Sequence, residues 1–231
     1  MFSQLSHTRF WFDLLQIIGI NILLSGDNAV VIALASRSLL PSQRQIAIIG
    51  GSAAAVALRI LLSLVIASLL TIPYLKLVGG ILLLYIGVKL IVAEESDGGE
   101  IAARSNLWGA IQTILIADAV MSLDNVVAIA AAAHGSTMLI TLGLLISIPL
   151  IVFGSQLLLG VLNRFPILVV LGAGLLGWIA GEIIVSDPAV HTYVPYDEHL
   201  LAKIAKPFLA LVVIGLGLAL SGRSSKEASE S

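Results

Sequence analysis

The chain has 231 residues, of which 58% are hydrophobic and only 11% are charged, and its formal net charge is -2. A soluble domain carries roughly 25% charged residues, so this composition excludes an ordinary soluble protein and indicates an integral membrane protein. A net negative charge without a clustered basic face excludes nucleic-acid binding. The absence of cysteine excludes disulfides, thiolate metal sites and thiol catalysis.

Apolar windows of about 20 residues, each long enough to cross a ~30 Å hydrocarbon core as a helix, fill nearly the whole chain. Backbone groups inside a bilayer need internal hydrogen-bond partners, so the alternatives are helices or a closed barrel. The apolar runs are continuous and do not alternate, which favours helices. We therefore predict an all-α membrane protein of about seven transmembrane helices in a single domain over residues 1–231. The start of the chain does not resemble a cleaved signal peptide, so we expect the first helix to be retained.

The predicted helices follow one another with short polar turns. In chain order they cover residues 11–35, 45–70, 73–93, 107–133, 138–162, 166–185 and 207–221. Pro149 should kink the fifth helix, since proline lacks the backbone N–H and clashes with the preceding turn. The last run is short for a full span, so it could begin at Leu200. We expect an outer loop over 187–206 and a disordered tail over 222–231.

Two similar polar signatures lie inside long apolar runs, at Ser25–Asn28 and Ser122–Asn125. A shift of 97 residues superimposes them, and the same shift aligns further polar residues. The aligned pairs are Asn21 with Asp118, Ser25 with Ser122, Asp27 with Asp124, Asn28 with Asn125, and Arg59 with Gln156. We therefore predict two repeats, over about 11–93 and 107–186, joined by a linker over 94–106. Three helices per repeat put the second copy upside down, so the prediction is an inverted 3+3 repeat plus one C-terminal helix, a recurrent plan of secondary transporters.

Three aspartates lie well away from the ends of these helices: Asp27, Asp118 and Asp124. A carboxylate near the bilayer centre costs about 2.5 to 3.5 kcal/mol on insertion scales, so each of them marks a functional site by default. Carboxylate, amide and hydroxyl oxygens are hard ligands that suit Mg²⁺, Ca²⁺ or Mn²⁺. Neighbouring carboxylates in a low dielectric need a cation or a proton to coexist. The same pocket could therefore exchange a metal ion for protons, and Gly26 would ease local unwinding beside it.

Other polar residues have plainer interpretations. Arg59 either neutralises the empty site or locks the second helix to a neighbour. Glu182 lies near a helix end, where extension of the side chain to the interface is the expected behaviour. Met121, next to Ser122, could add a soft thioether that favours Mn²⁺ over Ca²⁺ or Mg²⁺, but packing is the expected role of a methionine in a membrane helix. The remaining polar residues with metal-binding side chains lie in the predicted outer loop and are expected to be solvated: His191, Asp197, Glu198 and His199.

The two signatures, Asn21–Ala33 and Asp118–Ile129, resemble the paired motifs of the TerC family, in its short bacterial branch of YjbE-type metal transport proteins. This resemblance covers all seven predicted helices. It implies a cytoplasmic-membrane protein linked to manganese export and metal homeostasis, with a historical association with tellurite resistance. The family pattern has an acid six residues before each motif aspartate; Asp118 keeps it, whereas Asn21 replaces it. The ligand candidates that the resemblance implies are Asp27, Asn28, Asp118, Asp124 and Asn125, with supporting roles for Asn21, Ser25, Ser122, Arg59 and Glu182.

The first functional hypothesis is a secondary transporter that exports divalent metal ions, Mn²⁺ first among them, by proton-coupled alternating access between the first and fourth helices. The second is a non-transporting membrane partner that supplies metal to secreted proteins or a translocon; export of another cation is a third. We expect no enzyme activity, no resident cofactor and no nucleic-acid partner. A homo-oligomer or a secretion-machinery partner stays open. The resemblance implies the bacterial inner membrane. The basic residues of the short loops favour an orientation with the N-terminus outside and the C-terminus cytoplasmic.

Overall fold

A computed structural model describes residues 8–69, 72–95, 107–133, 136–193 and 197–230. All regular secondary structure in these residues is helical, which confirms the prediction of an all-α fold. In chain order, the helices are α2 (Thr8–Leu24), α3 (Gly26–Arg37), α4 (Pro41–Leu69), α5 (Leu75–Glu95), α6 (Leu107–Ala132), α7 (Thr137–Arg164), α8 (Ile167–Val185), α9 (Pro188–Tyr193) and α10 (Glu198–Glu230).

Five of these helices are long and apolar enough to cross a membrane, and two further spans are each made of a bent pair of helical segments. The first pair is α2 and α3, which meet at 50°. The second is α6, whose segments Leu107–Leu123 and Asn125–Ala132 meet at 58°. Counting each bent pair as one span gives up to seven spans, as the sequence predicts.

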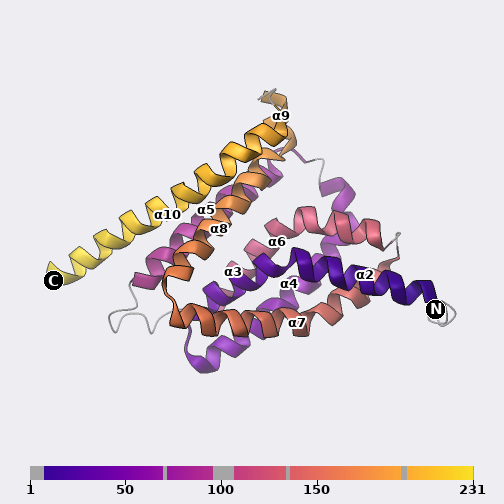
Figure 1. The fold of residues 1–231 in the computed structure, drawn as a ribbon, viewed down its shortest axis with the longest axis horizontal. Helices are drawn as coiled ribbons and strands as arrows, with labels where there is room; N and C mark the ends of the chain where they lie inside the picture. Colours follow the sequence, from indigo (N-terminus) through magenta and orange to yellow (C-terminus); the bar gives the residue numbers. More distant parts are fainter. Residues whose placement is uncertain (1–7, 70–71, 96–106, 134–135, 194–196, 231) are drawn as a thin grey trace.

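The helices form two groups in Figure 1. Helices α5, α8 and α10 lie side by side in one group, and α2, α3, α4, α6 and α7 form the other, with contacts between α3 and α8 and between α5 and α6 joining the two. Helix α4 packs on α6, as α7 packs on α2 and α3, and α5 packs directly on α8. The shift of 97 residues aligns α4 with α7, and it aligns α2 and α3 with α6. In two copies related by a pseudo-two-fold axis, the contact of α4 with α6 would therefore be equivalent to the contact of α7 with α2 and α3. The inverted repeat stays a prediction.

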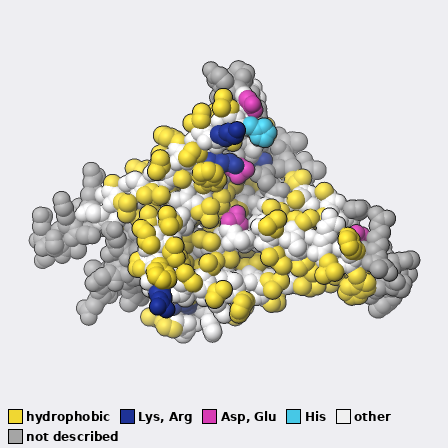
Figure 2. All heavy atoms as spheres, in the orientation of Figure 1, with side chains coloured by type: hydrophobic (Ala, Val, Ile, Leu, Met, Phe, Trp, Pro, Cys, Tyr) yellow, Lys and Arg dark blue, Asp and Glu magenta, His cyan; other side chains and the backbone are white. Residues whose placement is uncertain are grey.

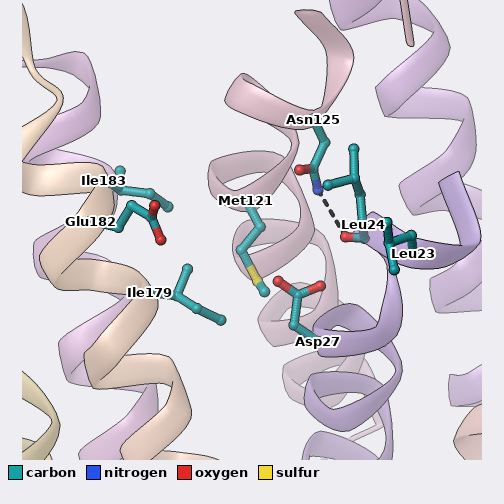
Figure 3. A pocket seen from close by; sticks show the side chains of 8 residues that line it. All are labelled: Leu23, Leu24, Asp27, Met121, Asn125, Ile179, Glu182 and Ile183. Carbon is teal, nitrogen blue, oxygen red and sulfur yellow. Dashed lines mark hydrogen bonds between the residues drawn. The ribbon is translucent and has the colours of Figure 1, made fainter. Parts of the chain in front are cut away.

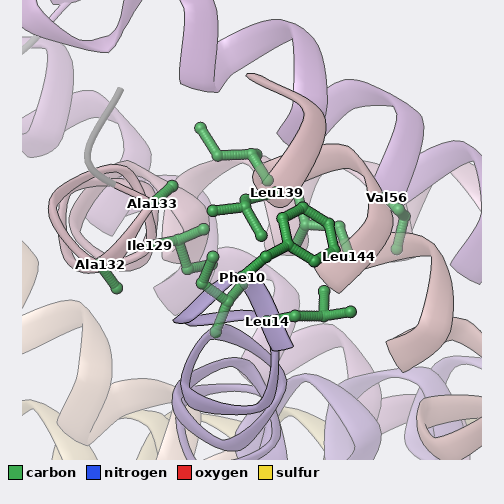
Figure 4. Close-up of a cluster of buried hydrophobic side chains, with 10 residues drawn as sticks. Phe10, Leu14, Val56, Ile129, Ala132, Ala133, Leu139 and Leu144 are labelled. Carbon is green, nitrogen blue, oxygen red and sulfur yellow. The ribbon is translucent and has the colours of Figure 1, made fainter. Parts of the chain in front are cut away.

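The interior is apolar and so is much of the surface. One buried cluster joins α2, α4, α6 and α7 and includes Phe10, Leu14, Ile129 and Leu144 (Figure 4). On the outside, hydrophobic side chains cover most of the face shown in Figure 2, and Leu23 keeps 82% of its surface exposed. In water this exposure would be costly, whereas against lipid it costs little.

The segment 187–206, predicted as an outer loop, is largely helical. It contains α9 and the first turns of α10, which begins at Glu198, close to the alternative start at Leu200 and not near Pro207. Charge and proline led to the wrong prediction, yet the leucine, alanine, lysine and glutamate of these turns are good helix formers. Helix α10 also runs on to Glu230, through most of the tail that was expected to be disordered. The predicted linker falls mainly outside the described residues.

Asp187, between α8 and α9, accepts hydrogen bonds from the N-terminal ends of α5 and α9. Its Oδ1 accepts hydrogen bonds from the backbone N–H groups of Tyr74 (3.0 Å) and Ala189 (2.7 Å), and its Oδ2 accepts one from Leu77 (3.0 Å). Burial alone would raise the pKa of Asp187, but the donors at Leu77, Ala189 and Tyr74 outweigh it and hold the pKa of this carboxyl below its usual range. One carboxylate therefore caps both α5 and α9.

We expect Asp187→Asn to lower the unfolding temperature at neutral pH. An amide offers one acceptor oxygen where the carboxylate offers two, so one helix loses its cap, at a cost of about 1 kcal/mol. Because the folded-state pKa is lowered, the ionised Asp187 stabilises the fold above its ordinary pKa of about 3.9, and this contribution is lost as the pH falls through the folded-state value. Thermal unfolding in detergent at pH 7, 5 and 3 measures it.

Asp197→Asn is the matched control for that variant. Asp197 is exposed, and among the described residues its side chain accepts a hydrogen bond only at Oδ1, from the His199 N–H, so an amide oxygen can replace it. The difference in unfolding temperature between the wild type and Asp187→Asn should become smaller toward pH 3, where Asp187 begins to be protonated. An equal effect of the two substitutions, or a gap that widens in acid, would contradict the double cap.

Candidate functional site

The first signature lies at a break in the first membrane span. Helix α2 ends at Leu24 and α3 begins at Gly26, with Ser25 in a non-helical conformation between them (φ -108°, ψ 6°). The side-chain amide of Asn125, at the bend of α6, donates a 3.1 Å hydrogen bond to the Leu24 carbonyl. The second signature thus satisfies a carbonyl at the break in the first signature. Broken helices that meet in this way form the substrate sites of many transporters.

A buried polar network surrounds Arg59, which comes from α4 and is only 1% exposed. Its Nη1 donates to Asn21 Oδ1 (2.8 Å) and Ser25 Oγ (3.0 Å), in the first signature. Its Nε donates to Ser122 Oγ (2.9 Å), and its Nη2 forms an ion pair with Asp118 Oδ1 (2.5 Å), both in the second signature. Arg59 therefore joins α4 to both signatures, and its charge is paired with the Asp118 carboxylate.

Beside this network lies a cavity of about 400 Å³ between α2, α3, α6 and α8. Carboxylates of Asp27 and Glu182 enter it from α3 and α8, and Figure 3 shows the Met121 side chain between them. The full lining is Leu23, Leu24, Asp27, Met121, Asn125, Ile179, Glu182 and Ile183. Two acids, an amide and a thioether thus face a space with otherwise apolar walls.

Asp27 and Asn28 differ in their surroundings although they are neighbours. The backbone N–H of Asn28 donates a 2.8 Å hydrogen bond to Asp27 Oδ1, which fixes that carboxylate at the first turn of α3. The helix N-terminus carries a partial positive charge that favours a carboxylate there. The side-chain amide of Asn28 is buried and has no hydrogen-bond partner among the described residues. It does not line the cavity.

The structure divides the predicted site residues between two adjacent places. Asp27, Asn125 and Glu182 line the cavity, whereas Asp118, Asn21, Ser25 and Ser122 bind Arg59. The side chain of Asp124 lies outside the described part of the chain. Among the described side chains, no group of three or more acids or histidines is arranged to hold a metal ion. A symmetric metal site would use both Asp27 and Asp124. Of these two side chains, the structure describes only that of Asp27.

Two contributors to this site, Lys206 and the Leu24 carbonyl, were not predicted. Glu182, which was predicted as a supporting residue near a helix end, lines the cavity and forms a 2.8 Å ion pair with Lys206 Nζ of α10. Lys206 itself was assigned to a loop. The Leu24 carbonyl was also missed, because the position of a helix break cannot be read from hydropathy; Gly26 was the one local signal for it.

Comparison with known proteins defines the family. The sequence model described as "Integral membrane protein TerC family" matches residues 6–229. The chain is 45% identical over 202 residues to the uncharacterized membrane protein YjbE of Bacillus subtilis, covering 87% of this chain and 91% of that protein. It is 24% identical over 207 residues to the uncharacterized membrane protein YkoY of the same organism, covering 81% of this chain and 64% of YkoY.

A more distant relative is the UPF0053 protein YegH of Escherichia coli, 28% identical over 181 residues, which are 70% of this chain and 34% of YegH. No solved structure matches the chain significantly. The family match over nearly the whole chain and the identity to YjbE agree with the two broken helices and their paired signatures. The chain is therefore a member of the TerC family of integral membrane proteins.

Proposed function

We propose that this protein is a secondary transporter that exports divalent metal ions, Mn²⁺ first among them, in exchange for protons across the bacterial inner membrane. One observation carries the proposal: an open cavity between α2, α3, α6 and α8, where two broken helices meet, is lined by Asp27 and Glu182. Intramembrane carboxylates that face a cavity mark ion pathways more often than they mark structural pairs.

The chemistry of the cavity suits a divalent cation. Two carboxylates supply a charge of -2 when both are ionised, and Asn125 can add a carbonyl oxygen, because its Nδ2 already donates to Leu24. Such oxygen donors suit Mn²⁺, Ca²⁺ and Mg²⁺. The Met121 thioether, a softer donor, lies between them and favours Mn²⁺ within that group.

The Arg59 network supports the same proposal because it pairs with the Asp118 carboxylate and leaves the Asp27 carboxylate for a ligand. Asp118 is neutralised by Arg59, so that carboxylate needs no external cation. Asp27 has no such ion pair among the described residues, and its oxygen accepts only from a backbone N–H. A carboxylate in a cavity with apolar walls is stable when it binds either a metal ion or a proton. Alternation between the two would couple metal export to proton entry.

The direct test in cells is Asp27→Asn. It removes the charge but keeps the shape, and we expect it to abolish the manganese tolerance that the wild-type protein confers on cells lacking other exporters. Asp13→Asn, which removes the same charge from α2 away from the cavity, is the matched control and should keep tolerance. Growth on graded MnCl₂, with membrane insertion checked by immunoblot, measures it. Unchanged tolerance in an Asp27→Asn strain that inserts the protein normally would reject the proposal.

A further inference from the structure

The ion pair between Glu182 and Lys206 lies at the wall of the cavity proposed above as the metal site. Glu182 contributes to the lining, and its Oε1 is 2.8 Å from Lys206 Nζ. We propose that the Lys206 ammonium is a resident counter-cation, which holds Glu182 while the cavity is empty and leaves it when a divalent cation binds. This inference rests on the proposed function, and it assigns a role to a residue outside both signatures.

The position of Lys206 is fixed by backbone packing. A Cβ at Gly181 would lie 2.8 Å from Lys206 Cα and 2.9 Å from the carbonyl carbon of Ala205, so α8 and α10 touch through their backbones at this point. Gly177 makes a similar contact with Leu209 one turn away. Since Glu182 follows Gly181 directly, the same contact that brings the helices together sets Lys206 beside Glu182. The pair is therefore placed by the fold and not by a chance meeting of two long side chains.

The exposure of the pair suits exchange. The Glu182 side chain is 55% exposed and that of Lys206 is 20% exposed, so the protein does not enclose the pair. Ion pairs of this kind contribute little, and their loss changes an equilibrium by roughly two- to fivefold. A divalent cation that also binds Asp27 can therefore displace the ammonium. The buried pair between Arg59 and Asp118, with side chains 1% and 8% exposed, has no comparable access to solvent.

The ammonium competes with the metal for one carboxylate, so its removal should tighten metal binding. For purified full-length protein titrated with MnCl₂ by calorimetry, we expect Lys206→Gln to lower the apparent Kd by about two- to fivefold. Lys203→Gln is the matched control, since it removes the same charge from α10 one turn away, and it should leave the Kd within about 1.5-fold of wild type. Glu182→Gln should weaken binding, and in that background Lys206→Gln should have no further effect.

A second measurement uses the wild-type chain and needs no variant to fold. Amine acylation followed by mass spectrometry reports how free each lysine is. MnCl₂ should increase the labelling of Lys206, because the metal releases its ammonium from Glu182, and should leave the labelling of Lys203 unchanged. MgCl₂ at the same concentration controls for ionic strength and should act less, because the cavity includes the Met121 thioether.

The outcomes separate this inference from the proposed function. If Asp27→Asn abolishes Mn²⁺ binding while Lys206→Gln behaves like Lys203→Gln, the metal site stands and the role of Lys206 is wrong. Weaker binding by Lys206→Gln, or Lys206 labelling that is insensitive to Mn²⁺, also overturns it. If the wild-type protein binds no Mn²⁺ at all, the proposed function fails and this inference fails with it.

Discussion

Arg59→Ala is expected to lower the free energy of unfolding by about 3 to 5 kcal/mol, because it leaves the buried Asp118 carboxylate without its partner. The same change removes the donors that Asn21, Ser25 and Ser122 now accept from. Each group left unsatisfied in the interior adds to the cost. Unfolding of the purified protein in detergent, followed by circular dichroism, measures the loss.

Two controls identify the cause. Arg164→Ala removes the same charge from an exposed position at the end of α7, so it should change stability by no more than about 0.5 kcal/mol. The double variant Arg59→Gln with Asp118→Asn makes the pair neutral while keeping hydrogen-bonding groups at both positions, and it should be more stable than either single variant. Strict additivity of the two single changes would show that the pair does not hold the signatures together.

Gly177→Ala is expected to cost about 1 to 3 kcal/mol through overpacking. The added Cβ would lie 2.6 Å from the Leu209 carbonyl oxygen and 2.8 Å from Ala210 Cα. Both neighbours are backbone atoms, so no flexible side chain can move aside and α10 must shift away from α8. Thermal unfolding in detergent measures the cost.

Gly160→Ala is the matched control, since nothing lies within 4 Å of a Cβ built at Gly160 on α7. That substitution should be neutral or slightly stabilising, because alanine favours helix more than glycine does. Because α8 also carries Glu182, we expect Gly177→Ala to loosen the ion pair with Lys206 as well. Equal unfolding temperatures for the two alanine variants would contradict the close contact of α8 and α10.

Much of the fold could be predicted from hydropathy alone. Helices in a bilayer must be long, apolar and internally hydrogen-bonded, so their number and approximate limits follow from composition. The signature residues could also be found, because polar side chains in apolar helices are costly and therefore informative. Asp27 and Asn125 line the cavity between α2, α3, α6 and α8.

The pairing of side chains could not be predicted, because it depends on how each helix is rotated about its axis. Sequence periodicity places Asp118 on a stripe of α6 but does not say that Arg59 of α4 faces it. The role of Lys206 was missed for a different reason: a lysine next to a proline was interpreted as loop, although α10 continues through Pro207. Contact between the backbones of α8 and α10, and not local sequence preference, decides that segment.

Metal flux into liposomes tests whether a divalent metal ion crosses the membrane through the cavity at Asp27. Purified protein is reconstituted into liposomes that contain a Mn²⁺-sensitive dye, a pH gradient is imposed, and MnCl₂ is added outside. We expect Mn²⁺ entry that the pH gradient accelerates in the wild type and in Asp13→Asn, and no entry above empty liposomes in Asp27→Asn. Flux by Asp27→Asn at the wild-type rate, or no flux by the wild type in either gradient direction, would contradict it.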